Sequence, residues 1–511
     1  MITRRRPFLF RLTALLATAS LAAVACSSGV PTKDYDAAKD QLSAKDAALA
    51  KAQTDLAKAQ ADLAAKVPGS VVQAGQLQPA PIGAPLTGWD TAESIRGGLK
   101  LVATYDSNGP DAFDVKAHPT VYFTSTGGPA LFAGLHVIDA YSKEVIAAVH
   151  YDLGAKVSPH TVGVSLDGKW AYLMGVRLLQ DGKTEEAVTL IINARTLKLD
   201  KVLKQESMMQ GSLRVQRLHH VTGYVDTKGR DRLVLEYGFG SSGGPHFVLD
   251  PKDNNRVVKA ITVEDTGYWM GHPFLTTDPA GKFLFVSLKN SAWQAVAHEI
   301  GGVAKINTET WAVTIIPGVG MHPIGMMVTA DGKFLYVNDG EDSYTYKIDL
   351  ATDTIVKKTS AVVAGPYGMA LNWDETLLYI AGKGEGSANQ GHILGVIDTK
   401  TFTPSRNLNV NQPIELGEGS KVVDHLFLHP DPAVNELWIS NMGGTVTTVL
   451  DLKTNTVKAR IPVPNGGTST HSGAFVRYNA DWTGKVLADH GGPKAEVLAV
   501  RLAKAQAAKA N

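Results

Sequence analysis

One internal repeat constrains the fold of this chain more than any other feature. Residues 321–337 (MHPIGMMVTADGKFLYV) align without a gap with residues 364–380 (AGPYGMALNWDETLLYI). The same pattern of an apolar run, a short polar turn and a second apolar run begins near residues 159, 219, 271, 321, 365, 424 and 470. Polar turns such as Asp-Gly between apolar runs are typical of β-hairpins. Units of four short strands repeated along a chain predict a β-propeller.

The predicted fold is therefore all-β, a seven-bladed β-propeller over residues 91–505. Eight blades are not excluded, because residues 120–152 contain a further incomplete unit. That unit could complete the ring by pairing with the C-terminal repeat, or it could be a blade itself. The sequence after residue 90 shows no amphipathic helix pattern, which argues against an α/β enzyme.

Residues 1–26 have the pattern of a signal peptide with a lipoprotein cleavage box. A basic start and a short apolar run lead to AVAC, in which Cys26 would be the lipidated residue. An ordinary secretory signal with an unrelated cysteine is the alternative. The segment RRPFLF resembles a twin-arginine (Tat) export motif. The expected location is periplasmic, with the protein anchored to a membrane as a lipoprotein and Tat export as one route.

Residues 32–66 predict a helical coiled-coil spacer that precedes the propeller. An apolar residue recurs every seventh position, at Tyr35, Leu42, Leu49, Leu56 and Leu63. A single solvated helix is the alternative, because lysines occupy two positions of the seam. A coiled coil would allow a homo-oligomer. Residues 67–90 are rich in Pro, Gly and Gln and predict a linker.

Composition excludes several kinds of site and partner. Cys26 is the only cysteine of 511 residues, so a mature chain has no disulfide, no thiolate metal site and no CxxCH haem attachment. The formal net charge is +1 with both signs interspersed, which gives no sign of a nucleic-acid partner.

Histidine recurs near the start of the first strand in six of the seven repeats, where a propeller strand lines the axis. These residues are His160, His220, His272, His322, His425 and His471. Imidazoles from several blades could converge there and bind a transition metal. They could instead form hydrogen bonds between blades, and this reading is favoured for His220 and His272 taken alone. Glu236 and Asp265 are candidate acidic ligands, with surface or turn carboxylates as the alternative.

These features resemble the copper-containing propellers, namely the propeller domain of nitrous oxide reductase and the thiocyanate dehydrogenases. Nitrous oxide reductase itself is disfavoured, because this chain lacks the cysteine pair of its second copper centre and has Gly365 where that family uses a histidine. Thiocyanate dehydrogenase, a lone propeller with a trinuclear copper centre, is the closer resemblance.

This resemblance implies a function and a set of residues. Metal ligands carried over by position are His118, His160, His322, His425, His471, Glu236 and Asp265, and the catalytic candidates are Glu236, Asp265 and Lys100. The implied reaction oxidises thiocyanate, a small anion, to cyanate and sulfur at copper, with electrons leaving to a carrier such as a c-type cytochrome. The main alternative is a non-catalytic, membrane-tethered lipoprotein that serves as a binding or scaffold module. A hydrolase or lactonase with one calcium or zinc ion is a third possibility.

Overall fold

The computed structural model describes residues 78–80, 82–87, 93–94, 99–127, 133–153, 157–178, 185–205, 217–239, 245–268, 270, 274–289, 300–384, 391–405, 413–464 and 470–510. They belong to one compact unit, Gln73–Asn511. The predicted signal peptide with Cys26 and the predicted coiled-coil spacer lie outside the described residues. Of the predicted linker, 67–90, only residues 78–80 and 82–87 are described.

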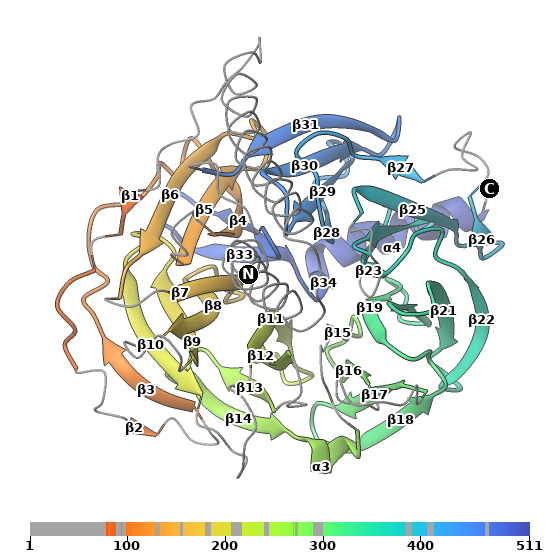
Figure 1. Ribbon diagram of the computed structural model, residues 1–511, viewed down its shortest axis with the longest axis horizontal. Helices are drawn as coiled ribbons and strands as arrows, with labels where there is room; N and C mark the ends of the chain where they lie inside the picture. Colours follow the sequence, from red (N-terminus) through yellow and green to blue (C-terminus); the bar gives the residue numbers. More distant parts are fainter. Residues whose placement is uncertain are drawn as a thin grey trace, which may run out of the picture. The chain divides into compact units, whose positions relative to one another are not determined.

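Antiparallel sheets stand as blades around a common axis, which confirms the prediction of an all-β propeller (Figure 1). Six sheets contain four consecutive strands each. From the axis outward they are β7 (Val157–Val164), β8 (Trp170–Leu178), β9 (Glu185–Asn193) and β10 (Leu199–Gln205); β11 (Arg217–Val225), β12 (Asp231–Phe239), β13 (His246–Asp250) and β14 (Arg256–Ile261); β15 (Leu275–Thr277), β16 (Phe283–Leu288), β17 (Gly302–Asn307) and β18 (Val313–Pro317); β19 (Pro323–Val328), β20 (Phe334–Asp339), β21 (Tyr344–Asp349) and β22 (Thr354–Ser360); β23 (Pro366–Leu371), β24 (Leu377–Gly382), β25 (Ile393–Asp398) and β26 (Thr403–Pro404); and β28 (Val423–Leu428), β29 (Glu436–Asn441), β30 (Val446–Asp451) and β31 (Thr456–Pro462). Short strands β2 (Glu93–Ser94) and β3 (Leu99–Thr104) extend the first of these sheets beyond β10, and β27 (Ile414–Glu415) pairs with β25.

A further sheet joins the two ends of the described chain. Its order is β1 (Gln78–Pro79), β6 (Val145–Tyr151), β5 (Ala133–Asp139), β4 (Thr120–Gly127), β32 (Gly473–Tyr478), β33 (Gly484–Asp489) and β34 (Gly492–Pro493). β4 and β32 are antiparallel, with Tyr122 opposite Phe475. The incomplete unit therefore pairs with the C-terminal repeat, which is the first of the two alternatives above. The number of blades stays a prediction.

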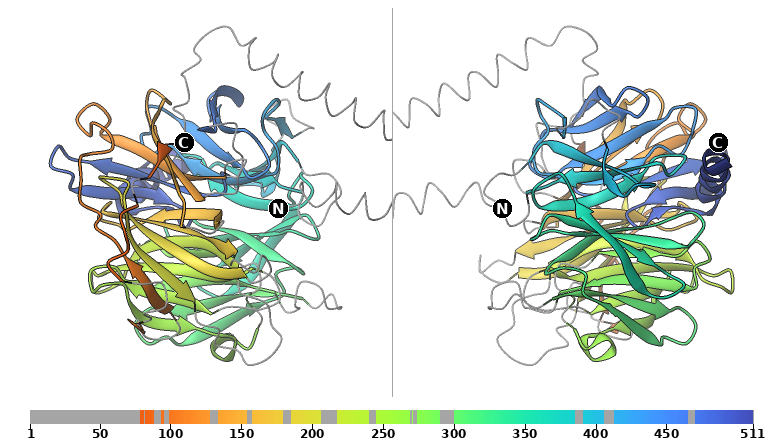
Figure 2. Two further views of the ribbon diagram at one scale, coloured as in Figure 1. Left: turned by 60° about the vertical axis from the view of Figure 1, so that its left-hand side comes forward. Right: turned by 90° about the vertical axis from the view of Figure 1, so that its right-hand side faces the viewer.

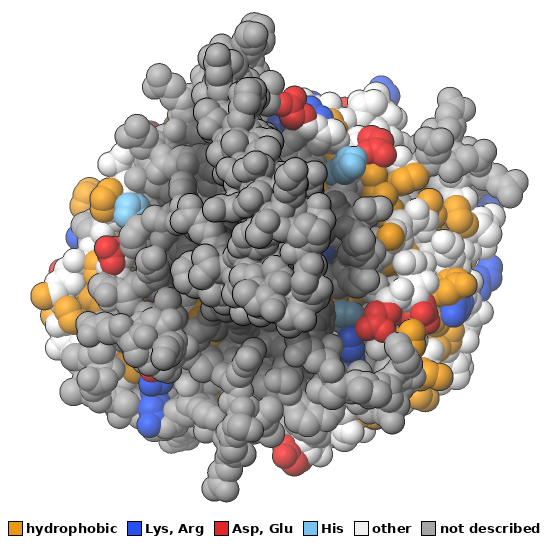
Figure 3. Space-filling view, viewed as in Figure 1, with side chains coloured by type: hydrophobic (Ala, Val, Ile, Leu, Met, Phe, Trp, Pro, Cys, Tyr) orange, Lys and Arg blue, Asp and Glu red, His pale blue; other side chains and the backbone are white. Residues whose placement is uncertain are grey.

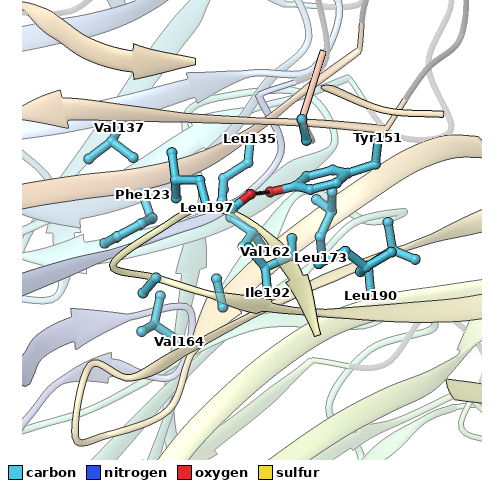
Figure 4. Packing of buried hydrophobic residues seen from close by; sticks show 14 of the residues in the cluster. Phe123, Leu135, Val137, Tyr151, Val162, Val164, Leu173, Leu190, Ile192 and Leu197 are labelled. Atoms are coloured by element: carbon cyan, nitrogen blue, oxygen red, sulfur yellow. Dashed lines mark hydrogen bonds between the residues drawn. The ribbon is translucent and has the colours of Figure 1, made fainter. Parts of the chain in front are cut away.

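Apolar side chains on both faces of the strands form the core between neighbouring sheets. In Figure 4, Tyr151 on β6 packs near Leu135 and Leu173, and its hydroxyl donates a hydrogen bond to the carbonyl oxygen of Leu197 at 2.9 Å. The bond satisfies the buried hydroxyl, so the ring can fill the interface without an unpaired polar group.

Two helices lie among the described residues, α3 (Val263–Thr266) and α4 (Ala495–Ala510). α4 corrects the expectation of no amphipathic helix after residue 90. Its buried residues recur every fourth position at Val497, Arg501 and Ala505, and the arginine among them hides the apolar pattern. Within the part of the chain that the structure describes, neither helix has the length and apolar character of a bilayer span.

Candidate metal centre

Most inner strands carry a β-bulge where they face the axis. In the ladder between β28 and β29, Val423 pairs with Asn441 and Leu426 with Ile439, so three steps on one strand match two on the other. The two residues within this bulge are Asp424 and His425. Bulges commonly re-aim side chains next to functional sites. Four other inner strands have an equivalent bulge. The residues within these bulges are His160 on β7, His219 and His220 on β11, Ile324 and Gly325 on β19, and Tyr367 and Gly368 on β23.

Two imidazoles bring their Nε2 atoms close to Nε2 of His220. His220 Nε2 lies 3.1 Å from His471 Nε2 and 2.9 Å from His425 Nε2. The three residues come from β11, from the chain just before β32, and from β28. Burial lowers the pKa of each imidazole well below the usual value, and neighbouring imidazoles lower it further, so all three are neutral.

Carboxylates lie behind two of these rings. Asp424 hydrogen-bonds to Nδ1 of His471, and Glu236 Oε2 lies 3.4 Å from Nδ1 of His220. Glu236 is buried on β12, and the Thr222 hydroxyl donates to its other oxygen at 2.9 Å. Burial raises the pKa of Glu236 well above its usual value. A carboxylate hydrogen-bonded to Nδ1 fixes the orientation and tautomer of the ring in many metal sites, and Asp424 has this position at His471. Among the described residues, His220 Nδ1 has no hydrogen-bond partner.

The chemistry of these groups fits a metal ion. With the proton on Nδ1, the Nε2 atoms of His220 and His471 present lone pairs toward each other, and lone pairs at that distance repel. A cation between the nitrogens would satisfy both. Two nitrogens bound at about 2.1 Å to one tetrahedral ion lie about 3.4 Å apart, close to the separations found. Imidazole nitrogen is a good ligand for copper, zinc, iron and nickel.

Further imidazoles extend this arrangement into one continuous cluster. Four overlapping groups could each hold a metal ion, since the ligand atoms within a group lie within 4.8 Å of one another: His160, His219 and His471; His220, His425 and His490; His219, His220 and Glu236; and Asp424, His425 and His471. We call these eight residues the histidine cluster. His160 is partly buried and the other seven are buried.

A buried lysine and a tyrosine flank the cluster. The Tyr367 hydroxyl lies 2.9 Å from His219 Nε2. Lys383 Nζ sits 3.6 Å from the centre of the Tyr367 ring and 3.7 Å from Asp424 Oδ1. Lys383 therefore places a positive charge beside the imidazoles, where it contributes to the lowered pKa of His425 and His471.

The structure brings together four of the residues singled out from the sequence: His160, His425, His471 and Glu236. It also places His220 in the centre of the cluster, although a structural hydrogen-bonding role was favoured for it. His272 lies outside the described residues.

The other sequence-predicted residues lie elsewhere among the described residues. His322 is buried just before β19 and belongs to none of the four groups. His118 is 27% exposed and pairs with Asp139 at 3.0 Å. Asp265 lies in α3 and pairs with Lys259 at 2.7 Å. Lys100 lies on β3, the strand outside β10.

Sequence reasoning missed His219, Asp424 and His490, together with the flanking Tyr367 and Lys383. Strict strand alternation sends adjacent residues to opposite faces, so only one residue of His219-His220 or Asp424-His425 was expected at the axis. The dipeptides were a usable signal, because a bulge allows both neighbours to reach one site. His490 follows the last repeat and so has no counterpart in the other copies.

Acidic and basic side chains are interspersed on the face of the molecule shown in Figure 3, as far as the described residues reach. This distribution agrees with the small net charge of the chain.

Comparisons with known proteins leave the family and the chemistry of this chain open. No protein-family model matches the sequence. No curated protein matches it either. Similar solved structures include the dihydro-heme d1 dehydrogenase NirN in complex with DHE, at 17% identity and a TM-score of 0.45 over 76% of this chain and 78% of that one. A protein of unknown function from Desulfotomaculum acetoxidans matches at 11% identity and a TM-score of 0.46, over 68% and 97% of the two chains. A protein described as a candidate 6-phosphogluconolactonase from Bacteroides fragilis matches at 16% identity and a TM-score of 0.43, over 68% and 96%. Similarities this low carry no argument about activity.

Proposed function

We propose that this protein is a copper-dependent oxidoreductase of the thiocyanate dehydrogenase type, with its metal ions in the histidine cluster. The observation that carries the proposal is the convergence of the Nε2 atoms of His220, His425 and His471, two of them with a carboxylate behind the ring. A metal ion between these nitrogens would be bound by their Nε2 lone pairs, with Nδ1 of His471 held by Asp424.

Copper is proposed over the other metals for two reasons. The donor set is imidazole and carboxylate without thiolate, which suits copper, zinc, iron or nickel. The resemblance of the repeat and its histidines to the copper propellers then favours copper, with three ions across the overlapping groups. When bound, copper would accept electrons and act as a Lewis acid toward a small anion.

The chain's own residues would prepare the site for that chemistry. Asp424 would hold the tautomer of His471, Tyr367 would orient His219, and Glu236 would lie beside His220 as a further ligand. Phe274 packs 5.2 Å from His220 and 5.4 Å from His425, measured between ring centroids, and would keep water from this side of the cluster. Lys383 would supply the fixed positive charge that attracts an anionic substrate into a site of low dielectric constant.

The proposed overall reaction converts thiocyanate and water into cyanate and sulfur, and releases two protons and two electrons. A c-type cytochrome or a similar carrier would take up the electrons. Oxygen from water forms the new bond to the thiocyanate carbon, while the carbon–sulfur bond breaks.

Three finer predictions complete the proposal. The sheet that joins β4, β5 and β6 to β32 would be the seventh blade. Lipidation at Cys26 and the coiled-coil spacer would tether the propeller to a membrane from the periplasmic side, after Tat or ordinary secretory export. The coiled coil would also allow a homo-oligomer.

One experiment tests the proposed function. The full chain is produced with copper, its metal content is measured, and thiocyanate-dependent reduction of a cytochrome c is followed together with cyanate release. About three coppers per chain and cyanate formation are expected, and His425→Ala should abolish both. A chain that retains no metal would point to the tethered binding module. One calcium or zinc ion without thiocyanate turnover would point to a hydrolase or lactonase.

A further inference from the structure

The chain that follows the last repeat crosses the propeller axis. β33 lies between β32 and the edge strand β34 of its sheet and contacts both β7 and β28. Figure 1 shows β33 and β34 near the centre of the ring, and Figure 2 shows α4 on one face of the propeller. Most of this segment, Gly484–Ala510, follows the last repeat, and β4 and β32 already join the two ends of the described chain.

Specific polar contacts hold the segment against two inner strands. The Asp489 carboxylate accepts hydrogen bonds from the backbone N–H of Gly223 on β11 at 2.8 Å and of Gly491 at 2.9 Å. Lys494 Nζ donates to the Gly223 carbonyl oxygen at 2.7 Å and pairs with Asp489. From β15, the Thr276 hydroxyl donates to the carbonyl oxygen of Gly491 at 2.8 Å.

The segment passes close to the side chain of Thr222 on β11 at Gly491. A Cβ atom added to Gly491 would lie 2.4 Å from Cγ2 of Thr222. A side chain at position 491 would therefore overlap the methyl group of Thr222, which would have to move.

α4 anchors the far end of the segment to two further strands. Arg501 is fully buried, and its Nε donates to Glu375 Oε1 at 2.9 Å. A terminal nitrogen of the same guanidinium donates to the carbonyl oxygen of Val328 on β19 at 3.3 Å. Glu375, which follows β23, also accepts from the backbone N–H of Ala330 at 2.7 Å. A buried ion pair at this depth fixes the position of the helix, because breaking it leaves a charge uncompensated.

The segment carries His490 into the histidine cluster. The His490 ring stacks on His220 with centroids 3.7 Å apart and an interplanar angle of 17°. Its Nε2 lies 4.0 Å from Glu236 Oε2, and its side chain has no exposed surface. Among the described residues, neither ring nitrogen of His490 has a hydrogen-bond partner. An unsatisfied buried polar group costs about 1–3 kcal/mol, so its presence here calls for a ligand.

We propose that residues 484–510 form an axial clasp that supplies His490 as a ligand to a copper ion shared with His220 and His425. Metal binding and docking of the clasp then stabilise each other, because the ion links a terminal segment to two blades. This inference rests on the proposed metal centre, to which it adds a ligand and a coupling.

Hydrogen exchange of the full chain, with and without Cu(II), tests the coupling without a variant. The reporting amides are those of Gly223 and Gly491, which donate to Asp489. Copper at 100 times its dissociation constant stabilises the bound form about 100-fold, so their exchange should slow by at least about tenfold. Unchanged exchange at these amides in a copper-loaded chain would overturn the clasp.

His490→Gln tests the ligand, with His136→Gln as the matched control. His136 is a buried imidazole on β5 that belongs to none of the four groups. Copper affinity should fall about 10- to 100-fold in His490→Gln and stay within about twofold in the control. If His490→Gln bound copper with wild-type affinity, the clasp would be overturned. The proposed metal centre would not be affected by this result. A wild-type chain that binds no copper would overturn both proposals.

Discussion

Two pairs of inner strands have the same type of β-bulge but carry different side chains in it. The bulges of β11 and β28 carry His219-His220 and Asp424-His425. The bulges of β19 and β23 carry Ile324-Gly325 and Tyr367-Gly368 instead. In all four ladders the inner strand has one extra residue at the same position. The four bulges therefore differ only in the side chains that they carry.

The glycines of the second pair serve the packing of neighbouring bulges. A Cβ on Gly325 would lie 1.8 Å from the Tyr367 carbonyl oxygen, and one on Gly368 would lie 2.5 Å from the Asp424 carbonyl oxygen and 3.3 Å from His425 Nδ1. Each glycine thus admits the bulge of the next blade. The comparison teaches that a glycine in one bulge makes room for the bulge of the next blade, and at Gly368 that neighbour carries His425.

Gly325→Ala should give the largest effect of the substitutions considered for these bulges. The new methyl group would overlap backbone, which cannot rotate away, so we expect the free energy of unfolding to fall by more than about 3 kcal/mol. Chemical denaturation measures the loss. Gly83→Ala is the control, because nothing lies within 4 Å of its added Cβ. Equal stability of the two variants would show that the bulges of β19 and β23 are not in close contact.

Substitutions in the histidine-bearing bulges should change the affinity for metal. His425→Ala removes an Nε2 from the point of convergence, and we expect copper affinity to fall by at least about 100-fold, since even partners behind metal ligands are worth 10- to 100-fold. His322→Ala, which changes a buried imidazole outside the four groups, should keep affinity within about threefold. Competition titration with a copper chelator measures both. A similar loss in both variants would mean that the cluster is not the metal site.

The propeller and its axis-facing histidines could be predicted because they repeat. Apolar runs separated by short turns recur along the chain, and hairpin rules translate them into blades. The alignment of His322 with Gly365 was sound, since the residues after them, Pro323 and Pro366, occupy the same ladder position.

The selection of His322 as a ligand depended on treating histidines a few residues apart in the repeats as equivalent. Val423 on β28 occupies the ladder position of Pro323 on β19, since both precede the bulge. His425 therefore corresponds to Gly325, and His322 lies three residues earlier. A one-residue bulge leaves no mark in an apolar pattern, so the sequence could place histidines near the axis without ranking them. His490 could not be predicted for a different reason, because it belongs to no repeat.

Asp424→Asn should weaken copper binding by a smaller factor than loss of His425. The amide can still fill the space beside His471 Nδ1, but it cannot hold the imidazole tautomer as a carboxylate does, and losses of about 10- to 100-fold are typical. Glu436→Gln is the matched control, because Glu436 is a buried acid on β29 outside the four groups. The same chelator titration distinguishes them. If Asp424→Asn bound copper with unchanged affinity, the carboxylate of Asp424 would serve only in packing. His425 would then be the only residue of the β28 bulge that takes part in metal binding.

The smallest effect concerns an imidazole that sits in a regular ladder, His136 on β5, opposite Thr124. Burial lowers the pKa of His136 from 6.5 to about 3. Between these two values the unfolded chain binds a proton that the folded chain excludes, so stability falls as the pH decreases below 6.5. From pH 7.5 to pH 5.5 this single group should remove about 1.4 kcal/mol of unfolding free energy. Urea denaturation of copper-free wild type and His136→Gln at both pH values measures the difference. If both chains lose the same free energy, the ladder imidazole takes up its proton without unfolding. The distinction between imidazoles kept neutral by burial and imidazoles that bind a metal would then no longer rest on their pKa values.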